Sequence, residues 1–202
     1  VPFKKSVIPF LDELTQLAKE TQSVNTIFKK DNKIVGDNTD VAGFKQSLGY
    51  INCNVKNKKV FILGAGGVVS SILKALEKLG AAKVYMVEAN RELLKTAIEN
   101  VSEYCMNEPD PKVYPINAII GTSDAEGCYV TKRAPLPVNE LDRISFKELI
   151  RQYGITKIDY LKCDIEGNEY DVFNKNTLEY CFNNVKHMAI EIHVKATLDG
   201  PS

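Results

Sequence analysis

Hydrophobic and polar positions divide the chain into a short N-terminal part and a longer part with a different pattern. Apolar residues at helical spacing from 8 to 18 predict a helix, and apolar runs at 26–28 and 33–35 flank a turn as a hairpin. Residues 41–50 predict a further helix, and the polar run 52–59 is typical of a linker. We therefore expect a helix-hairpin appendage in residues 1–50 and a separate domain in residues 58–202.

From residue 59 onwards, short apolar strands alternate with amphipathic helices. The strands are expected at 60–63, 83–87, 113–120, 157–163 and 187–194, and the helices at 72–79, 94–101, 146–153 and 169–182. Residues 121–143 form a long loop in which a short hairpin is expected near 128–131. This alternation predicts an α/β fold, a doubly wound Rossmann-like parallel sheet with strand order 3-2-1-4-5.

A glycine-rich turn follows the first of these strands, at the edge of the sheet where such folds bind ligands. It consists of Gly64, Ala65, Gly66 and Gly67. Glycine lets a backbone approach a ligand closely, and the amides that open the next helix favour an anion such as pyrophosphate or a carboxylate. The alternative is a tight turn that serves packing only.

Glu88 ends the second predicted strand, about 20 residues after the turn, where an acidic side chain can accept both ribose hydroxyls of an adenosine. The same carboxylate would repel a 2′-phosphate. Together with the glycine turn it predicts a site for the adenosine end of a nucleotide-type cofactor. A solvated charge at a strand end is the alternative.

Composition narrows the range of partners. The chain has 26 basic and 26 acidic side chains, so no net field attracts nucleic acid or an anionic membrane. We expect a small-molecule substrate, no nucleic-acid or membrane partner, and leave the oligomeric state open. Five cysteines without a C-x-x-C pair indicate reduced thiols and a cytoplasmic location. No apolar run approaches the ~18 residues of a membrane span.

Four stretches in the first part of the chain form a specific set: Val-Pro-Phe-Lys at 1–4, Val-Asn-Thr-Ile at 24–27, Gly-Asp-Asn-Thr-Asp at 36–40 and Gly-Ala-Gly-Gly-Val-Val at 64–69. Through them, residues 1–80 closely resemble shikimate dehydrogenases, and the first 50 residues resemble part of the substrate domain. The resemblance implies that Lys4 and Asp40 are a catalytic pair, that Asn25 contacts shikimate, and that NAD or NADP is the cofactor. By residue type alone, these three would be surface and turn residues. The chain opens on Val1 rather than methionine, inside a matching stretch, and whether its N-terminus is truncated stays open.

A second set of stretches follows: Val-Tyr-Met-Val-Glu-Ala-Asn at 84–90, Ile-Asn-Ala-Ile-Ile-Gly at 116–121 and Ile-Asp-Tyr-Leu-Lys-Cys-Asp-Ile-Glu-Gly-Asn-Glu at 158–169. Residues 83–194 resemble FkbM-type methyltransferases, which are S-adenosylmethionine-dependent O-methyltransferases. The resemblance implies that Glu88 holds the ribose of S-adenosylmethionine and that Asn117 and Ala118 border its adenine. It also implies that Asp164 and Glu166 line the reaction cleft.

Methyl transfer needs mainly an acceptor oxygen held in line with the sulfonium, and a general base can assist. Asp164, Glu166 and His193 are candidate bases by type and by their position at strand ends. Asp164 and Glu166 could instead cap the following helix, and for His193 we favour a strand residue making one hydrogen bond. A divalent ion is conceivable here, but no full ligand set is visible, and we expect no metal.

The two resemblances meet near residues 80–84, so the sequence predicts a chimera. Our main hypothesis is an FkbM-type O-methyltransferase that carries a dehydrogenase-derived glycine turn and N-terminal segment. The alternatives are an NAD(P)-dependent shikimate dehydrogenase and an inactive hybrid of the two folds.

Overall fold

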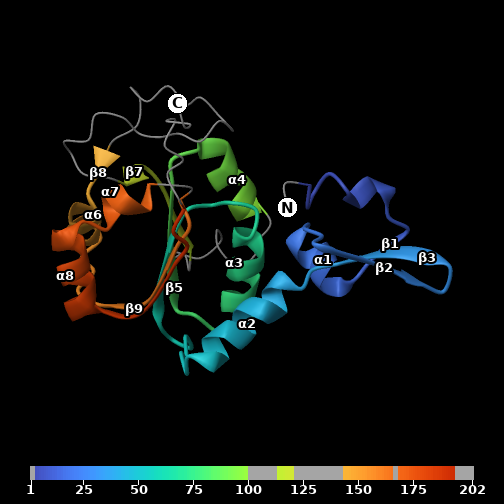
Figure 1. Cartoon of the computed structure of the whole chain (residues 1–202), viewed down its shortest axis with the longest axis horizontal. Helices are drawn as coiled ribbons and strands as arrows, with labels where there is room; N and C mark the ends of the chain where they lie inside the picture. Colours follow the sequence, from blue (N-terminus) through green and yellow to red (C-terminus); the bar gives the residue numbers. More distant parts are fainter. Residues whose placement is uncertain (1–2, 100–112, 121–142, 166–167, 194–202) are drawn as a thin grey trace, which may run out of the picture.

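The computed structural model describes residues 3–99, 113–120, 143–165 and 168–193. A three-layered α/β part is built around one parallel sheet, and a smaller N-terminal part lies beside its helix α3 (Val69–Lys78) (Figure 1). The hairpin expected near residue 128 lies outside the described residues, as do Cys105, Cys128 and Glu166.

The small part begins with a 3-10 helix and contains a three-stranded sheet in the order β1-β3-β2. Its elements are η1 (Ile8–Phe10), β1 (Glu13–Leu14), α1 (Gln16–Thr21), β2 (Thr26–Lys30) and β3 (Lys33–Asp37). The helix α2 (Asp40–Tyr50) follows and packs against the larger part. The hairpin is confirmed, because β2 and β3 pair antiparallel around Asp31 and Asn32, both with positive φ. The helix at 41–50 is confirmed as α2.

The helix expected over residues 8–18 is wrong. Thr15 accepts a hydrogen bond from the amide of Ala18 and so starts α1 only at Gln16. Before it, residues 8–10 form η1, the chain is extended from Leu11, and β1 pairs with β3 in parallel. Leu11 and Leu14 point at Gly36, where an added Cβ would lie 2.5 Å and 3.0 Å from their side chains. Both residues are apolar because they pack on the hairpin, and their helical spacing does not indicate a helix.

The main sheet has five parallel strands in the order β10-β9-β4-β5-β6. Their bounds are β4 (Lys59–Leu63), β5 (Lys83–Glu88), β6 (Val113–Asn117), β9 (Ile158–Cys163) and β10 (Val185–Ile190). Numbered along the chain, this is the predicted order 3-2-1-4-5. The detail differs, because the third predicted strand ends at Asn117 and the next residues form β7 (Ile119–Ile120). This strand pairs with β8 (Arg143–Ile144) in a separate sheet.

Helices cover both faces of the main sheet (Figure 1). α2, α3 and α4 (Arg91–Glu99) lie on one face, and α6 (Phe146–Gln152), α7 (Glu169–Val172) and α8 (Lys175–Asn184) lie on the other. The side chains of β4 point alternately to the two faces of the sheet. Val60 and Ile62 join the core cluster under α3, whereas Phe61 and Leu63 join the core cluster under α6. The single helix predicted at 169–182 is divided in two, because Asn174 is extended and caps α8 by accepting from the amide of Thr177.

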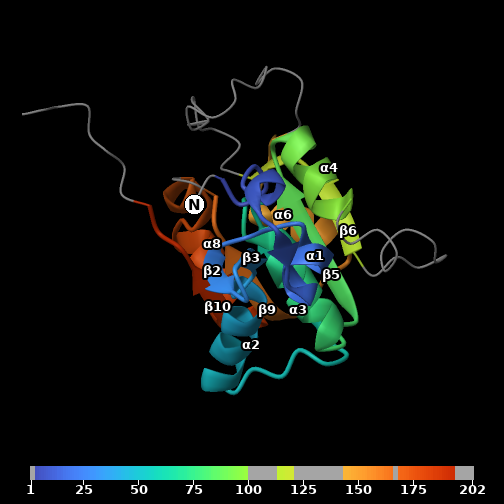
Figure 2. The same ribbon diagram turned by 90° about the vertical axis from the view of Figure 1, so that its right-hand side faces the viewer.

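A buried polar contact fastens the small part to α3. Asn38 is 1% exposed, and its side-chain amide donates to the carbonyl of Ser23 and to the hydroxyl of Ser71 in α3, at 3.0 and 2.9 Å. Beside it, Glu20 of α1 pairs with Lys74 and Lys78 of α3 at 3.7 and 3.1 Å. Figure 2 looks from this side and shows the small part in front of α3.

Three described cysteines, Cys53, Cys163 and Cys181, are buried free thiols. Burial raises the pKa of Cys181 to about 11. No helix in the described ranges is both long enough and apolar enough to cross a bilayer.

Candidate functional site

The glycine turn lies where the ends of three strands meet. Gly64 follows β4 with a φ of +99°, and its amide donates to the carbonyl of Val87 in β5 at 2.8 Å. On the other side, the amide of Asp164 donates to the carbonyl of Leu63 at 2.9 Å. A Cβ on Gly64 would lie 1.9 Å from the carbonyl oxygen of Asp164. Only glycine fits this position, for its conformation and for its space.

The next two glycines face open space. Gly66 and Gly67 are exposed, and a Cβ added to either would meet no atom within 4 Å. A ligand can therefore approach the backbone closely at these residues. The turn was expected to lead directly into the next helix. The helix α3 begins only at Val69, after a bend closed by a hydrogen bond from the Val69 amide to the Gly66 carbonyl.

Glu88 holds the turn in place. One oxygen of its carboxylate accepts from the amide of Ala65 and the other from the amide of Asn90, both at 2.7 Å. The negative charge thus lies directly against the turn, on a carboxylate, which can only accept hydrogen bonds. The sequence placed Glu88 correctly at the end of β5 but did not reveal its bond to the turn.

The residues expected to border an adenine lie beside Glu88. Asn117 is its partner in the β5–β6 register, and the amide of Ala118 donates to the Glu88 carbonyl at 3.2 Å. Ala118 is 7% exposed. The structure therefore gathers the turn, Glu88 and residues 117–118 at the carboxyl ends of β4, β5 and β6.

The expected catalytic pair of the N-terminal part is also brought together. The Lys4 ammonium lies 2.7 Å from the Asp40 carboxylate, although 36 positions separate the two residues. The amide of Val24 donates to the carbonyl of Lys4 at 2.8 Å, which places Lys4 beside the segment that carries Asn25 and leads into β2. Both charged side chains are mostly buried, at 14% and 23% exposure, so water screens their attraction only partly.

Asn25 lies at the same junction. Its side-chain oxygen accepts from the amide and the hydroxyl of Thr39 and from the hydroxyl of Thr26, at 3.0, 3.1 and 3.0 Å. Thr39 directly precedes Asp40, so this network sets Asn25 next to the Lys4–Asp40 pair. Within the described part of the chain, the side-chain N–H groups of Asn25 make no hydrogen bond, which leaves them to donate to a ligand.

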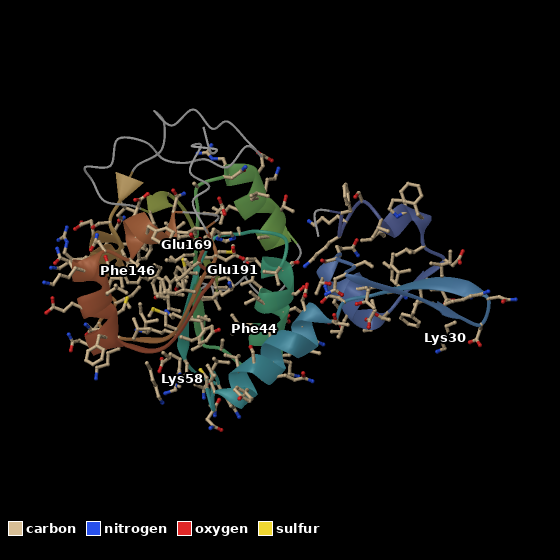
Figure 3. All side chains as sticks on the ribbon, viewed as in Figure 1. Lys30, Phe44, Lys58, Phe146, Glu169 and Glu191 are labelled. Carbon is tan, nitrogen blue, oxygen red and sulfur yellow. The ribbon has the colours of Figure 1, made fainter. Side chains whose placement is uncertain are left out.

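A second polar cluster lies at the carboxyl ends of β9 and β10. His193 Nδ1 lies 3.0 Å from the carboxylate of Glu169, while His193 Nε2 lies 4.0 Å from Asp164 and 3.8 Å from Glu191. Lys162 lies 3.8 Å from Asp164 and 3.7 Å from Glu191. Figure 3 labels Glu169 and Glu191 at this end of the sheet.

Burial raises the pKa of Asp164 above its ordinary value, and the nearby carboxylates of Glu191 and Glu169 raise it further. Lys162 and His193 act in the opposite direction. Asp164 does not cap the following helix: the Ile165 amide instead donates to the Glu169 carboxylate at 3.0 Å. Of the two acidic residues expected here, Asp164 takes part in the cluster and Glu166 lies outside the described residues.

Sequence reasoning did not single out Lys162, Glu169 or Glu191, and it misplaced His193. Glu169 was seen only as the start of a helix, although it ends the stretch 158–169 that resembles methyltransferases, and Glu191 was seen only as a strand residue. His193 was expected inside a strand, but β10 ends at Ile190 and His193 follows it. The pattern of residues around β10 cannot reveal that α7, on a separate segment, supplies Glu169 as the partner of His193.

Asp164, Glu191 and His193 also form a possible cation site, since one ligand atom from each lies within 4.8 Å of the others. The Lys162 ammonium already lies near the second oxygen of each carboxylate. The donor types suit a divalent ion, but a bound cation would be repelled by that ammonium.

Comparison with known proteins gives relatives that are shikimate dehydrogenases. The chain is 64% identical over 99 residues to the NADP(+) shikimate dehydrogenase of Pelagibacter ubique, which covers 49% of this chain and 36% of that protein. It is 35% identical over 123 residues to the Aquifex aeolicus enzyme, covering 61% of this chain and 45% of the relative. The chain thus spans less than half the length of these two relatives.

Solved structures support the fold. The crystal structure of shikimate dehydrogenase from Aquifex aeolicus superposes with a TM-score of 0.57 at 24% identity, over 93% of this chain and 63% of that one. The Listeria monocytogenes shikimate 5-dehydrogenase, solved with shikimate and NAD, gives 0.60 at 15% identity, over 94% and 65%. At these identities, the likeness is one of architecture.

The parallel sheet, the glycine turn at its carboxyl edge and the acidic end of β5 define a Rossmann-like protein of the class that binds nucleotide-type cofactors. Within that class, the model of the methyltransferase FkbM domain matches residues 54–200. The chain belongs to the FkbM methyltransferase family, and it carries an N-terminal segment similar to shikimate dehydrogenases. The family match begins earlier than the resemblance at residue 83 predicted, and it includes the glycine turn.

Proposed function

We propose that the chain binds S-adenosylmethionine at the Gly64–Gly67 turn and Glu88, and transfers its methyl group to a hydroxyl oxygen. The observation that carries this proposal is the contact between Gly64 and the carbonyl of Asp164. It puts the cofactor turn beside the cluster at the ends of β9 and β10. A cofactor on the turn can therefore extend its reactive end over that cluster.

The charges of the cluster suit the chemistry. The sulfonium of S-adenosylmethionine is a cation, and Asp164 and Glu191 offer carboxylates near the place where it would react. Lys162 moderates that negative field without occupying the side that faces His193. The remaining requirement is an acceptor oxygen held in line with the methyl group, which needs few protein groups.

The balance of acidic and basic residues and the buried free thiols support two further parts of the proposal. The methyl acceptor is a small molecule, and the protein acts in the cytoplasm. Neither nucleic acid nor a membrane is a partner.

Calorimetric titration of the purified chain with S-adenosylmethionine, S-adenosylhomocysteine, NAD and NADP, each separately, tests the cofactor. We expect heat of binding for the two sulfur compounds. Binding of NADP together with silence for both sulfur compounds would contradict the proposal. Silence for all four would support the third hypothesis, an inactive hybrid.

A second candidate function is shikimate dehydrogenation, in which a hydride leaves the alcohol carbon for a nicotinamide. The observation that favours it is the Lys4–Asp40 ion pair at 2.7 Å, with the side-chain N–H groups of Asn25 at the same junction. The named relatives, which are shikimate dehydrogenases, support this candidate better than they support methyl transfer. NAD suits the Glu88 carboxylate better than NADP does, because a 2′-phosphate would be repelled.

Shikimate-dependent formation of NADH or NADPH tests this second candidate. The variant Lys4→Met removes the ammonium and keeps a similar length, while Lys5→Met changes an exposed neighbour outside the ion pair. Loss of turnover of about 100-fold in Lys4→Met alone is expected for a general acid–base group. Equal turnover in the two variants would refute the role of Lys4.

A further inference from the structure

Glu169 is an unusual residue for the interior. It is 2% exposed, yet it ends in a carboxylate, which is costly to bury without partners. One of its oxygens accepts from the amide of Ile165 and lies 3.0 Å from Nδ1 of His193. A carboxylate can only accept, so this contact requires a hydrogen on Nδ1. Glu169 thereby selects one tautomer of the neutral imidazole.

In that tautomer, the lone pair of His193 is on Nε2. This atom is 4.0 Å from Asp164 Oδ1 and 3.8 Å from Glu191 Oε1, at the carboxyl ends of β9 and β10. The same edge of the sheet carries the glycine turn, because Gly64 contacts the carbonyl of Asp164. His193 is 29% exposed in its side chain, so a small molecule can reach it.

We propose that His193 is the general base of the methyl transfer and that Glu169 is its positioning residue. The inference rests on the first proposed function. The acceptor oxygen forms a bond to the methyl carbon as the carbon–sulfur bond breaks, and S-adenosylhomocysteine leaves with the electron pair of that bond. The hydroxyl proton passes to Nε2 of His193, and the imidazolium that forms is stabilised by Glu169 through Nδ1–H.

The charged groups around His193 fit this role. Glu169, Asp164 and Glu191 face the ring, and their negative charges stabilise an imidazolium once the proton has moved. Lys162 pairs with the outer oxygens of Asp164 and Glu191. A divalent ion bound by His193, Asp164 and Glu191 would have to face that ammonium, so the geometry favours the base.

The tautomer can be measured without any substrate. The chain has only two histidines, His187 in β10 and His193, so 15N-histidine NMR spectra of the wild type and of His187→Asn assign both rings. We expect neutral His193 to carry its proton on Nδ1. In Glu169→Gln, an amide donor can face the ring, and the preference for Nδ1–H is expected to disappear. A proton on Nε2 in the wild type would overturn the proposal.

Two ligands test whether His193 lies near the transferred methyl group. Sinefungin carries an amine group at the place of the sulfonium methyl group, and S-adenosylhomocysteine carries neither group at that place. Sinefungin is expected to shift the Nε2 resonance of His193 and not that of His187, whereas S-adenosylhomocysteine leaves both nearly unchanged. Bound sinefungin without a response at His193 would overturn the proposal. A response of Nε2 to magnesium chloride alone would replace the base by a metal site.

Turnover gives the final comparison, with glycerol, methyl glucoside and catechol as hydroxyl acceptors. His193→Asn is expected to lower kcat by about 10²–10⁴-fold with unchanged affinity for S-adenosylmethionine, while His187→Asn behaves as the wild type. Wild-type kcat in His193→Asn would refute the base. If the wild type methylates none of the three, the sinefungin response alone decides. If no sulfur compound binds, the proposed function fails, and the tautomer measurement still decides whether Glu169 positions the ring.

Discussion

The amide of Ala65 donates a hydrogen bond to the carboxylate of Glu88 at 2.7 Å, so the glycine turn and the end of β5 form one unit. The same carboxylate accepts from Asn90, which starts the segment leading into α4. A side chain that the sequence assigns to a ligand thus also shapes the site that receives the ligand.

This double role predicts the effect of Glu88→Gln. The variant removes the charge and leaves one of the two amides facing an N–H group, so the turn loses part of its support. We expect at least about a tenfold loss of affinity for the adenosine cofactor, since a hydrogen bond to a charged group contributes about 1.5–3 kcal/mol. Calorimetry measures it. Glu92→Gln, at an exposed position of α4, serves as the control, and equal affinities in the two variants would contradict the expectation.

Gly64→Ala is expected to unfold at a lower urea concentration than the wild type. The new Cβ would fall 1.9 Å from the carbonyl oxygen of Asp164, and the residue would keep a φ of +99° that alanine disfavours. Together these effects should cost at least about 2 kcal/mol. Gly66→Ala adds the same group in open space and should stay within about 0.5 kcal/mol of the wild type. If Gly64→Ala and Gly66→Ala unfolded at the same urea concentration, β4 and β9 would separate more easily than the contact implies.

The contact between Asn38 and Ser71 should contribute strongly to stability. Asn38→Ala leaves the Ser23 carbonyl and the Ser71 hydroxyl without their buried partner, at a cost of about 2 kcal/mol. With Ser71→Ala, a double-mutant cycle should give a coupling of about 1 kcal/mol. Additive effects in urea unfolding would show that the small part is not held to α3 by this pair.

Asp164 gives a prediction about pH. Burial raises the pKa of this carboxyl in the folded state, so the folded chain holds its proton more tightly than the unfolded chain does. The free energy of unfolding therefore falls as pH rises from the pKa of Asp164 in the unfolded chain to its pKa in the folded chain. Above the folded pKa, the chain stays less stable by this amount. Asp164→Asn should raise the urea midpoint at neutral pH.

The gain in Asp164→Asn should vanish below the ordinary pKa of 3.8, where the carboxyl is protonated in both states. Urea unfolding at acidic and neutral pH measures both regimes. Asp31→Asn, in the exposed hairpin turn, is the matched control because asparagine also accepts its positive φ. A gain of equal size at both pH values would show that titration is not its cause.

The sequence predicts most of the main sheet because each strand has a short apolar run and each helix an apolar face. The β4 pattern, with Val60 and Phe61 pointing to opposite layers, is readable from such a run. The structure of residues 8–18 cannot be read from their apolar pattern, because Leu11 and Leu14 pack on Gly36 from an extended chain. Their spacing matches a helix by coincidence.

The candidate sites show the same limit. Lys4 and Asp40 were paired through resemblance to a family, and the structure brings them to 2.7 Å, while their roles stay predictions. The contact between Glu169 and His193 has no sequence signal, since it depends on how the break at Asn174 and the end of β10 place α7 against the sheet. Partners from separate segments become visible only in three dimensions.

The close approach of Gly64 to Asp164 bears on how such a chain can arise. Gly64 lies in a stretch that resembles dehydrogenases, and Asp164 lies in one that resembles methyltransferases. At this close contact, Gly64 has no side chain, and its partner is the backbone carbonyl of Asp164, a group that every amino acid has. Segments from two lineages can be joined there without co-adapted side chains, so the contact places no demand on the side chain at position 164 as long as position 64 is glycine.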